Sequence, residues 1–152
     1  MPDMNLMGKR VLITTADVFM GPVLCKVFAE HGATVIESTD SLLSPDSPAS
    51  VVAAVGQIDV LVVNLAVPAP TTDVTEVLDE EWRDTFAALV NPLPRLFRAV
   101  LPALNERCAG KLLIIASAYA LRGRKRTSTT LAAEGADVAL VQACGVEVAD
   151  PN

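Results

Sequence analysis

The chain has 152 residues, 51% of them hydrophobic, which is enough for one α/β domain with a sizeable core and too few for two. Its formal net charge of −6, with mostly dispersed basic residues, argues against nucleic acid as a partner. Three cysteines without paired spacing, a single histidine, and no apolar run of secretory or membrane length favour a cytoplasmic protein with reduced thiols, no metal and no membrane partner.

The first predicted elements are a strand over 11–13, a tight turn, and a helix over 21–30. Strand, turn and helix in this order begin a nucleotide-binding α/β unit, in which glycines in the turn let a pyrophosphate approach the backbone. Only Gly21 remains of those glycines. Thr15 stands at the position of the first glycine and Phe19 at that of the second, so side chains project into the space that a dinucleotide needs.

On these residues the chain resembles the short-chain dehydrogenase/reductase superfamily, and within it the halohydrin dehalogenases, a branch that lost the cofactor. That branch replaces the glycine pattern by T-x4-F/Y-x-G, which Thr14, Phe19 and Gly21 match. The resemblance implies that these residues are vestiges of a cofactor site or line a halide pocket. It also implies that NAD or NADP is bound only if the chain is an ordinary dehydrogenase. A Phe that packs the turn onto the core is the structural alternative.

A second strand is predicted over 33–37, which is rich in β-branched residues. The superfamily resemblance places the usual ribose-binding acidic residue at Thr39, which again counts against a dinucleotide. The turn-forming stretch that follows is expected to hold only a vestigial edge strand at Leu42 and Leu43 and a short helix over 51–56.

A near-continuous apolar run over 58–64 predicts a parallel strand buried on both faces. Asn64 ends this run, and the resemblance implies that it ties the sheet end together by backbone hydrogen bonds. A long helix is predicted over 79–105, with a kink or break near Asn91 because two prolines follow directly. The resemblance makes Asn91 the residue that holds a water in a proton relay. An Asn that satisfies carbonyls freed by the prolines is an equal alternative.

A further buried strand over 111–117 ends in Ser117, at the sheet edge where open parallel sheets place their active sites. By resemblance Ser117 holds the substrate oxygen, a Tyr follows thirteen residues later, and a Lys or Arg lies four residues beyond it. Those positions are Thr130 and Glu134 here. An adjacent cation can bring a phenol toward a neutral pKa, whereas an aliphatic hydroxyl is far too weakly acidic. The catalytic pair is therefore expected to be degenerate.

The last predicted helix covers 129–149. The resemblance implies that residues 1–152 form one Rossmann-like, doubly wound α/β domain with a parallel sheet of four or five strands, lacking the usual C-terminal third. It also implies a homo-oligomer in which the long helices that begin at Asp79 and Thr129 pair across a twofold axis. Four basic residues within 122–126 are interpreted as a solvated loop.

Two functions from different classes remain open. The first is a short-chain dehydrogenase/reductase-like protein of halohydrin-dehalogenase type, which would convert a vicinal haloalcohol to an epoxide and halide, with impaired catalysis. Its partner would be a small molecule such as a haloalcohol or epoxide. The second is a catalytically silent protein that acts by pairing with itself or with a full-length relative. An NAD(P)-dependent oxidoreductase is a further alternative.

Overall fold

A computed structural model describes residues 6–149, so residues 1–5 and 150–152 of the predicted domain lie outside the described residues. The chain divides into two compact units. Unit 1 consists of residues 1–66 and 95–115, and unit 2 of residues 67–94 and 116–152. One domain over 1–152 stays a prediction.

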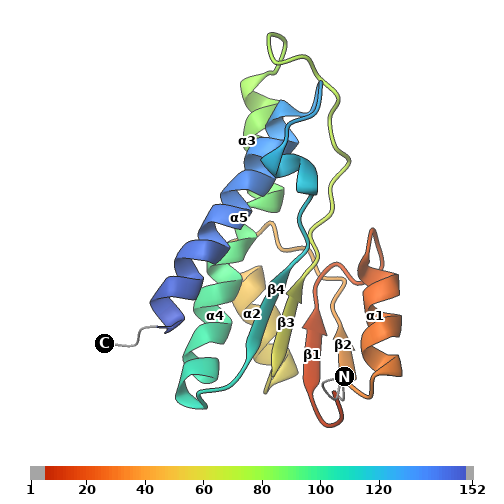
Figure 1. Cartoon of the computed structure of the whole chain (residues 1–152), viewed down its shortest axis with the longest axis vertical. Helices are drawn as coiled ribbons and strands as arrows, with labels where there is room; N and C mark the ends of the chain where they lie inside the picture. The colour runs from red at the N-terminus through yellow and green to blue at the C-terminus, as the bar shows by residue number, and fades with distance from the viewer. Residues whose placement is uncertain (1–5, 150–152) are drawn as a thin grey trace. The chain divides into compact units, whose positions relative to one another are not determined.

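Unit 1 contains a four-stranded, all-parallel sheet in the order β2-β1-β3-β4 (Figure 1). Its strands are β1 (Arg10–Ile13), β2 (Thr34–Glu37), β3 (Val60–Val63) and β4 (Lys111–Ile114). The register places Leu12 opposite both Ile36 and Leu61, and all four residues of β3 are buried, as a strand covered on both faces requires. The sheet confirms the predicted Rossmann-like α/β fold class, and each strand overlaps its predicted segment.

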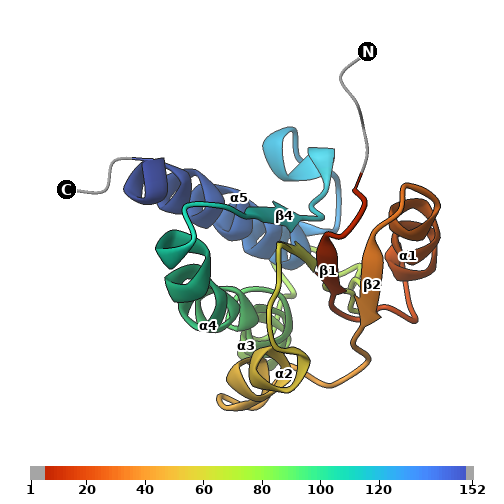
Figure 2. The same cartoon turned by 90° about the horizontal axis from the view of Figure 1, so that it is seen from below.

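Helices flank this sheet on both sides, which makes the unit doubly wound. The helices are α1 (Gly21–Glu30), α2 (Ser47–Val55) and α4 (Pro92–Glu106), the last with its residues 95–106 in unit 1. Figure 2 shows α1 on one face of the sheet and α2 and α4 on the other. The bounds of α1 match the prediction, whereas α2 begins four residues earlier than predicted. The reason is Pro48, whose fixed φ and missing N–H suit the first turn of a helix.

The predicted vestigial strand at Leu42 and Leu43 is wrong. Both residues lie in an irregular segment, in which Leu42 is buried and Leu43 is exposed. The segment therefore contributes one apolar side chain to the interior and no hydrogen-bonded edge to the sheet.

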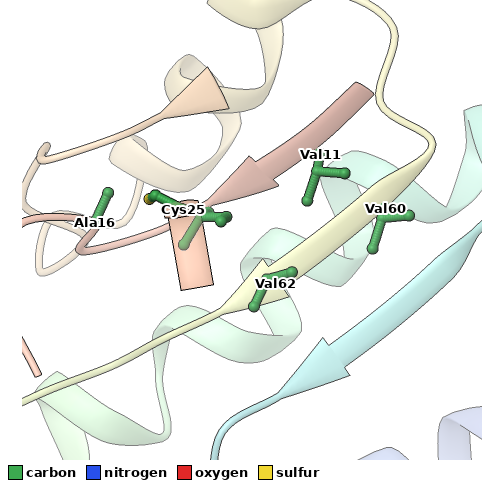
Figure 3. Packing of buried hydrophobic residues seen from close by; sticks show 6 residues of the cluster. Val11, Ala16, Cys25, Val60 and Val62 are labelled. Carbon is green, nitrogen blue, oxygen red and sulfur yellow. The ribbon is translucent and has the colours of Figure 1, made fainter. Parts of the chain in front are cut away.

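One hydrophobic cluster joins the face of β1 and β3 to α1. Figure 3 shows Val11, Val60 and Val62 of the strands near Ala16 of the turn and Cys25 of α1. Cys25 is a free thiol, and burial raises its pKa. This packing fixes α1 against the carboxyl end of β1, which positions the intervening turn.

Unit 2 is helical. It contains α3 (Asp79–Leu89), the short 3-10 helix η1 (Ala118–Leu121) and α5 (Ser128–Ala149), and α3 packs beside α5 (Figure 1). The helical segment predicted over 79–105 forms two helices, because α3 ends at Leu89 and α4 begins at Pro92. The predicted break near Asn91 is confirmed. None of the described helices is long and apolar enough to cross a membrane.

Candidate functional site

The turn between β1 and α1 keeps the backbone of a glycine-rich turn without its glycines. Thr15 has a φ of 47° and Phe19 a φ of 54°, both in the left-handed region that favours glycine. These are the two positions at which the nucleotide-binding pattern has its first and second glycine. A left-handed conformation costs a non-glycine residue about 1–2 kcal/mol, so other contacts must hold the turn in this shape.

Asn64, which follows β3, supplies those contacts. Its side-chain Nδ2 donates to the carbonyl oxygens of Thr15 at 2.8 Å and Val18 at 3.1 Å. Its main-chain N–H donates to Thr14 Oγ1 at 3.1 Å, and that hydroxyl donates to the Asn64 carbonyl oxygen at 3.3 Å. Thr14 and Asn64 are fully buried. Both residues therefore have a structural role, fastening the turn to the end of the sheet.

Gly21 has a steric role at the start of α1. A Cβ at this position would lie 2.7 Å from the Thr15 carbonyl oxygen and closer still to that of Ala16. Phe19, by contrast, does not pack the turn onto the core, because its side chain is 66% exposed. The turn thus presents an aromatic side chain where the nucleotide-binding pattern leaves open backbone.

The residues of this region do not fit a dinucleotide. The side chains of Thr15 and Phe19 stand at both glycine positions. Thr39, where the ribose-binding carboxylate was expected after β2, is exposed and carries a hydroxyl group. The nearby Asp40 carboxylate accepts a hydrogen bond from Ser38 Oγ at 3.1 Å. No step of chemistry through NAD or NADP follows from these residues.

We expect titration calorimetry to show no measurable binding of NAD or NADP by the wild type. The physical reason is that the Thr15 and Phe19 side chains occupy the approach of the pyrophosphate to the backbone. The Thr15→Gly/Phe19→Gly variant tests whether those side chains are the barrier. Micromolar affinity in the wild type, equal to that of the variant, would contradict this assignment.

Ser117 and Glu134 come together in unit 2. Ser117 caps η1, where its Oγ accepts the N–H of Tyr119 at 3.1 Å. The main chain of Ser117 lies near the Glu134 carboxylate and acts to lower the pKa of that carboxyl group. Thr130 lies one turn before Glu134 on α5, and its buried Oγ1 has no hydrogen-bond partner among the described residues. The position of the expected base is therefore a threonine hydroxyl, and that of the expected cation is a carboxylate.

Asp137 lies on α5, one turn after Glu134. The sequence analysis did not single it out as a candidate site residue. Its side chain is 4% exposed, and burial together with the charge of Glu134 raises its pKa to about 7. Burial also raises the pKa of Glu134, while the main chain of Ser117 opposes that rise. Glu134 Oε2 and Asp137 Oδ1 have no partner within residues 6–149. One signal in the sequence could have identified Asp137: it is an acidic residue within the apolar stretch ADVALV, three positions after Glu134.

Asn91 lies apart from these groups in the hydrogen-bond network of unit 2. It is exposed at the junction of α3 and α4, and its main-chain N–H donates to the Phe86 carbonyl oxygen at 3.0 Å. Among the described residues no hydrogen bond joins Asn91 to Ser117, Thr130 or Glu134. The proton-relay role of Asn91 gains no support from this geometry. The described residues also contain no group of three or more side chains suited to hold a metal ion.

The family model for short chain dehydrogenases matches residues 45–152. The chain belongs to this family. The resemblance seen in the sequence is thus confirmed at the level of the superfamily.

Relatives and solved structures agree with membership of the short chain dehydrogenase family. The 3-oxoacyl-(acyl-carrier-protein) reductase FabG of Vibrio harveyi is 25% identical over 171 residues, covering 96% of this chain and 70% of the relative. The uncharacterized oxidoreductase YvrD of Bacillus subtilis is 31% identical, covering 76% of this chain and 53% of the relative. A solved structure titled "Dehalogenation enzyme" has a TM-score of 0.80 and 27% identity, covering 89% of this chain and 64% of that one. A short chain dehydrogenase from Shigella flexneri, with a TM-score of 0.85 and 20% identity over 97% of this chain and 69% of that one, shows the fold alone.

Two features of this short chain dehydrogenase family member bear on its function. In unit 1 the turn after β1 is left-handed at Thr15 and Phe19, two residues other than glycine. In unit 2 the positions expected to hold the family's phenol and cation are Thr130 and Glu134, and Asp137 adds a buried carboxyl group one turn after Glu134.

Proposed function

We propose that this family member is of the halohydrin-dehalogenase type: it binds a small haloalcohol or epoxide and carries an impaired proton-transfer site. The observation that carries the proposal is the left-handed turn with side chains at Thr15 and Phe19, because a site that binds no dinucleotide leaves room for a small molecule. The likeness to a dehalogenation enzyme at 27% identity supports it. The reductase relatives support the NAD(P)-dependent alternative, which the two side chains oppose.

The reaction of this type has a simple balance. A base takes the proton of the substrate hydroxyl, the oxygen attacks the neighbouring carbon, and a C–O bond forms as the C–halogen bond breaks and halide leaves. Ser117 can orient the substrate oxygen, since its Oγ accepts from Tyr119 and keeps its own hydrogen to donate. Thr130 cannot take the proton near neutral pH, and the Glu134 carboxylate disfavours negative charge beside it. The phenol that accepts the proton in this type of enzyme is the group that this site lacks.

The silent alternative is a protein that acts by pairing with itself or with a full-length relative. Large exposed apolar side chains on unit 2 favour it, among them Leu78, which is 68% exposed, and Trp82. In this alternative α3 and α5 would pair with their counterparts across a twofold axis. A variant in which the catalytic Tyr and Arg are introduced distinguishes the dehalogenase function from the silent alternative, because only the first predicts activity.

We expect halide release from a vicinal haloalcohol by the Thr130→Tyr/Glu134→Arg variant and not by the wild type. The guanidinium, one turn from the introduced phenol, would favour phenolate and so supply the missing base. General acid and base catalysis contributes about 10²- to 10⁴-fold in rate, so the rate of halide release by the double variant should increase by a factor of this size. Each single substitution should fail, because a phenol beside Glu134 keeps a high pKa and the Glu134→Arg change alone adds no base.

The control is the double variant with Ser117→Ala added, in which halide release should fall back because the substrate oxygen is no longer oriented. Robust release by the wild type that Ser117→Ala leaves unchanged would show that the active site has been placed wrongly. A folded double variant that releases no halide at all would favour the silent alternative.

A further inference from the structure

The loop between η1 and α5 carries a group of cations that the proposed function does not use. This cationic loop, residues 122–125, contains Arg122, Arg124 and Lys125, all of them exposed. No Asp or Glu occurs between Glu106 and Glu134, although the whole chain has a net charge of −6. The segment that joins Ser117 to α5 is therefore positively charged in an acidic chain.

The cationic loop is connected to Ser117 through Tyr119. Ser117 Oγ accepts from the Tyr119 N–H at 3.1 Å, and the Tyr119 carbonyl oxygen accepts from the N–H groups of Arg122 at 3.1 Å and Gly123 at 2.8 Å. The guanidinium carbon of Arg124 lies 5.6 Å from the centre of the Tyr119 ring, a cation–π contact. One residue thus links the hydroxyl expected to hold the substrate oxygen to the guanidinium of Arg124.

The other end of the cationic loop is fixed to α5. Thr127 Oγ1 donates to the Arg124 carbonyl oxygen at 2.9 Å, and the Thr127 carbonyl oxygen accepts from the Leu131 N–H at 2.9 Å. The preceding helix η1 packs against α5, which carries Thr130. A ligand would therefore meet a partly preorganised surface beside the site, which lowers the entropy lost on binding.

The surface between Ser117 and the cationic loop is open to a ligand. Ser117 is half-buried, and the neighbouring Ala118 and Tyr119 are exposed. Leu121 is 77% exposed, so an apolar side chain stands directly before the cations. A short carbon chain between a hydroxyl at Ser117 and a charged group at the loop would have an apolar surface to contact.

The charges of the cationic loop form no ion pair among residues 6–149, where the ion pairs are Lys26–Glu30 and Arg107–Asp59. Arg126, the next residue, differs because it is engaged elsewhere. Its Nε donates to the Thr71 carbonyl oxygen at 3.1 Å. Hydrogen bonds from Thr75 lower the pKa of Asp73, and the charge of Arg126 adds to this effect. Arg126 is therefore left out of the group available to a ligand.

Carboxylates in unit 2 determine which way round an anionic ligand would lie. The Glu134 carboxylate lies near the main chain of Ser117 and opposes negative charge there. Glu81 accepts from Thr72 Oγ1 at 2.6 Å and from Thr129 Oγ1 at 2.9 Å, at the start of α5. The exposed charges at the start of α3 are of both signs, Arg83 standing beside Asp79, Glu80 and Asp84. Negative charge is thus favoured at the cationic loop and opposed at Ser117.

We propose that the small molecule bound by this protein carries an anionic group, which the cationic loop binds while Ser117 holds the hydroxyl oxygen. Guanidinium groups suit this role because their planar forks match carboxylate and phosphate groups. The inference rests on the proposed function and deepens it, since it names anionic haloalcohols or epoxides as the substrate class. The charges of Glu134 and of the loop orient such a molecule, with its neutral end at Ser117.

Binding of charged and neutral chlorohydrins to the wild type tests the inference without requiring turnover. The probes are 4-chloro-3-hydroxybutanoate, 3-chloro-2-hydroxypropyl phosphate and the neutral 1-chloro-2-butanol, titrated in ligand-observed NMR. The anionic probes should bind about three- to tenfold more tightly than the neutral one, because several exposed ion pairs, each weak, act together. Added salt should reduce this preference. The anionic probe that is bound more tightly identifies carboxylate or phosphate as the preferred group.

Three variants assign the preference to residues. Arg122→Gln/Arg124→Gln/Lys125→Gln should bring the ratio of anionic to neutral affinity close to one. The matched control is Lys9→Gln/Lys26→Gln/Arg98→Gln, which removes three exposed cations of unit 1 and should retain the wild-type ratio. Ser117→Ala should weaken the binding of anionic and neutral chlorohydrins alike, because both place their hydroxyl there.

The possible failures are distinguishable. Equal affinities for anionic and neutral probes, or a preference that the loop variant retains, would overturn this inference and leave the proposed function standing. Butanoate that binds as tightly as its chlorohydrin, with no effect of Ser117→Ala, would contradict the proposed function and with it the substrate class. Binding of none of the chlorohydrins would overturn both. Tight binding of a hexaglutamate peptide without any preference among the small molecules would assign the loop to an acidic protein and overturn this inference.

Discussion

Gly21→Ala is expected to destabilise the protein by about 3 kcal/mol or more, at the upper end of the cost of overpacking. The added Cβ would lie 2.7 Å from the Thr15 carbonyl oxygen and closer to that of Ala16. Both contacts are with backbone, which cannot yield as a flexible side chain would. The Ala16 N–H is itself bonded to the Ser38 carbonyl oxygen at 3.0 Å, so a shift of the turn would also disturb the end of β2.

Gly145→Ala is the matched control. Gly145 lies inside α5, and a Cβ there would have no neighbour within 4 Å. Its replacement should therefore stabilise the protein by about 0.5–1 kcal/mol, the helix preference of Ala over Gly. Urea unfolding followed by circular dichroism measures both changes. Equal effects of the two substitutions would show that the close approach at Gly21 is not a constraint.

The second large effect concerns Asp137→Asn and depends on pH. The native carboxyl group has a pKa of about 7, raised from 3.8 by burial and by Glu134. The folded state therefore holds a proton that the unfolded state releases between about pH 4 and pH 7, so stability falls as pH rises through this range. At pH 8 the wild type keeps a buried charge, and the variant should be more stable by about 2–4 kcal/mol, from about 1.4 kcal/mol for each unit of pKa shift.

The measurement is the free energy of unfolding of both proteins from pH 4 to pH 8. The variant should lose most of the decline that the wild type shows. Asp84→Asn, which removes an exposed carboxylate from α3 and leaves Glu134 and Asp137 in place, is the control and should retain the wild-type slope. A wild type whose stability is constant or rises over this range would show that Asp137 is not buried as described.

Most of the fold could be predicted because each strand is marked by its own composition. Four apolar runs rich in Val, Ile and Leu became the four strands, and α1 has the bounds that its pattern predicts. The errors in the predicted helix bounds arose where a proline lies at the start of a helix. Pro48 starts α2 early, and Pro92, which suits the first turn of a helix, begins α4 instead of kinking a longer helix. Periodicity cannot distinguish those two uses of proline.

The candidate site was harder to predict because its decisive features are conformations and burial. The sequence shows Thr15 and Phe19 at glycine positions, but only the structure shows that the backbone stays left-handed there. Asp137 and Glu81 each stand in helices whose patterns give no sign that the side chains lie inward or bridge two elements. Burial of a single polar residue depends on tertiary packing, which a one-dimensional pattern does not contain.

The Asn64 contacts also bear on the order in which the chain folds. Thr14 and Asn64 are 50 positions apart, so the hydrogen bonds that fix the turn close a long loop. Closing such a loop loses chain entropy before any contact compensates it. We expect the turn after β1 to hold its left-handed residues only once β3 has paired with β1 and brought Asn64 into place. The strained turn should then form late in folding and be lost early in unfolding, although the strand before it lies between two others in the sheet.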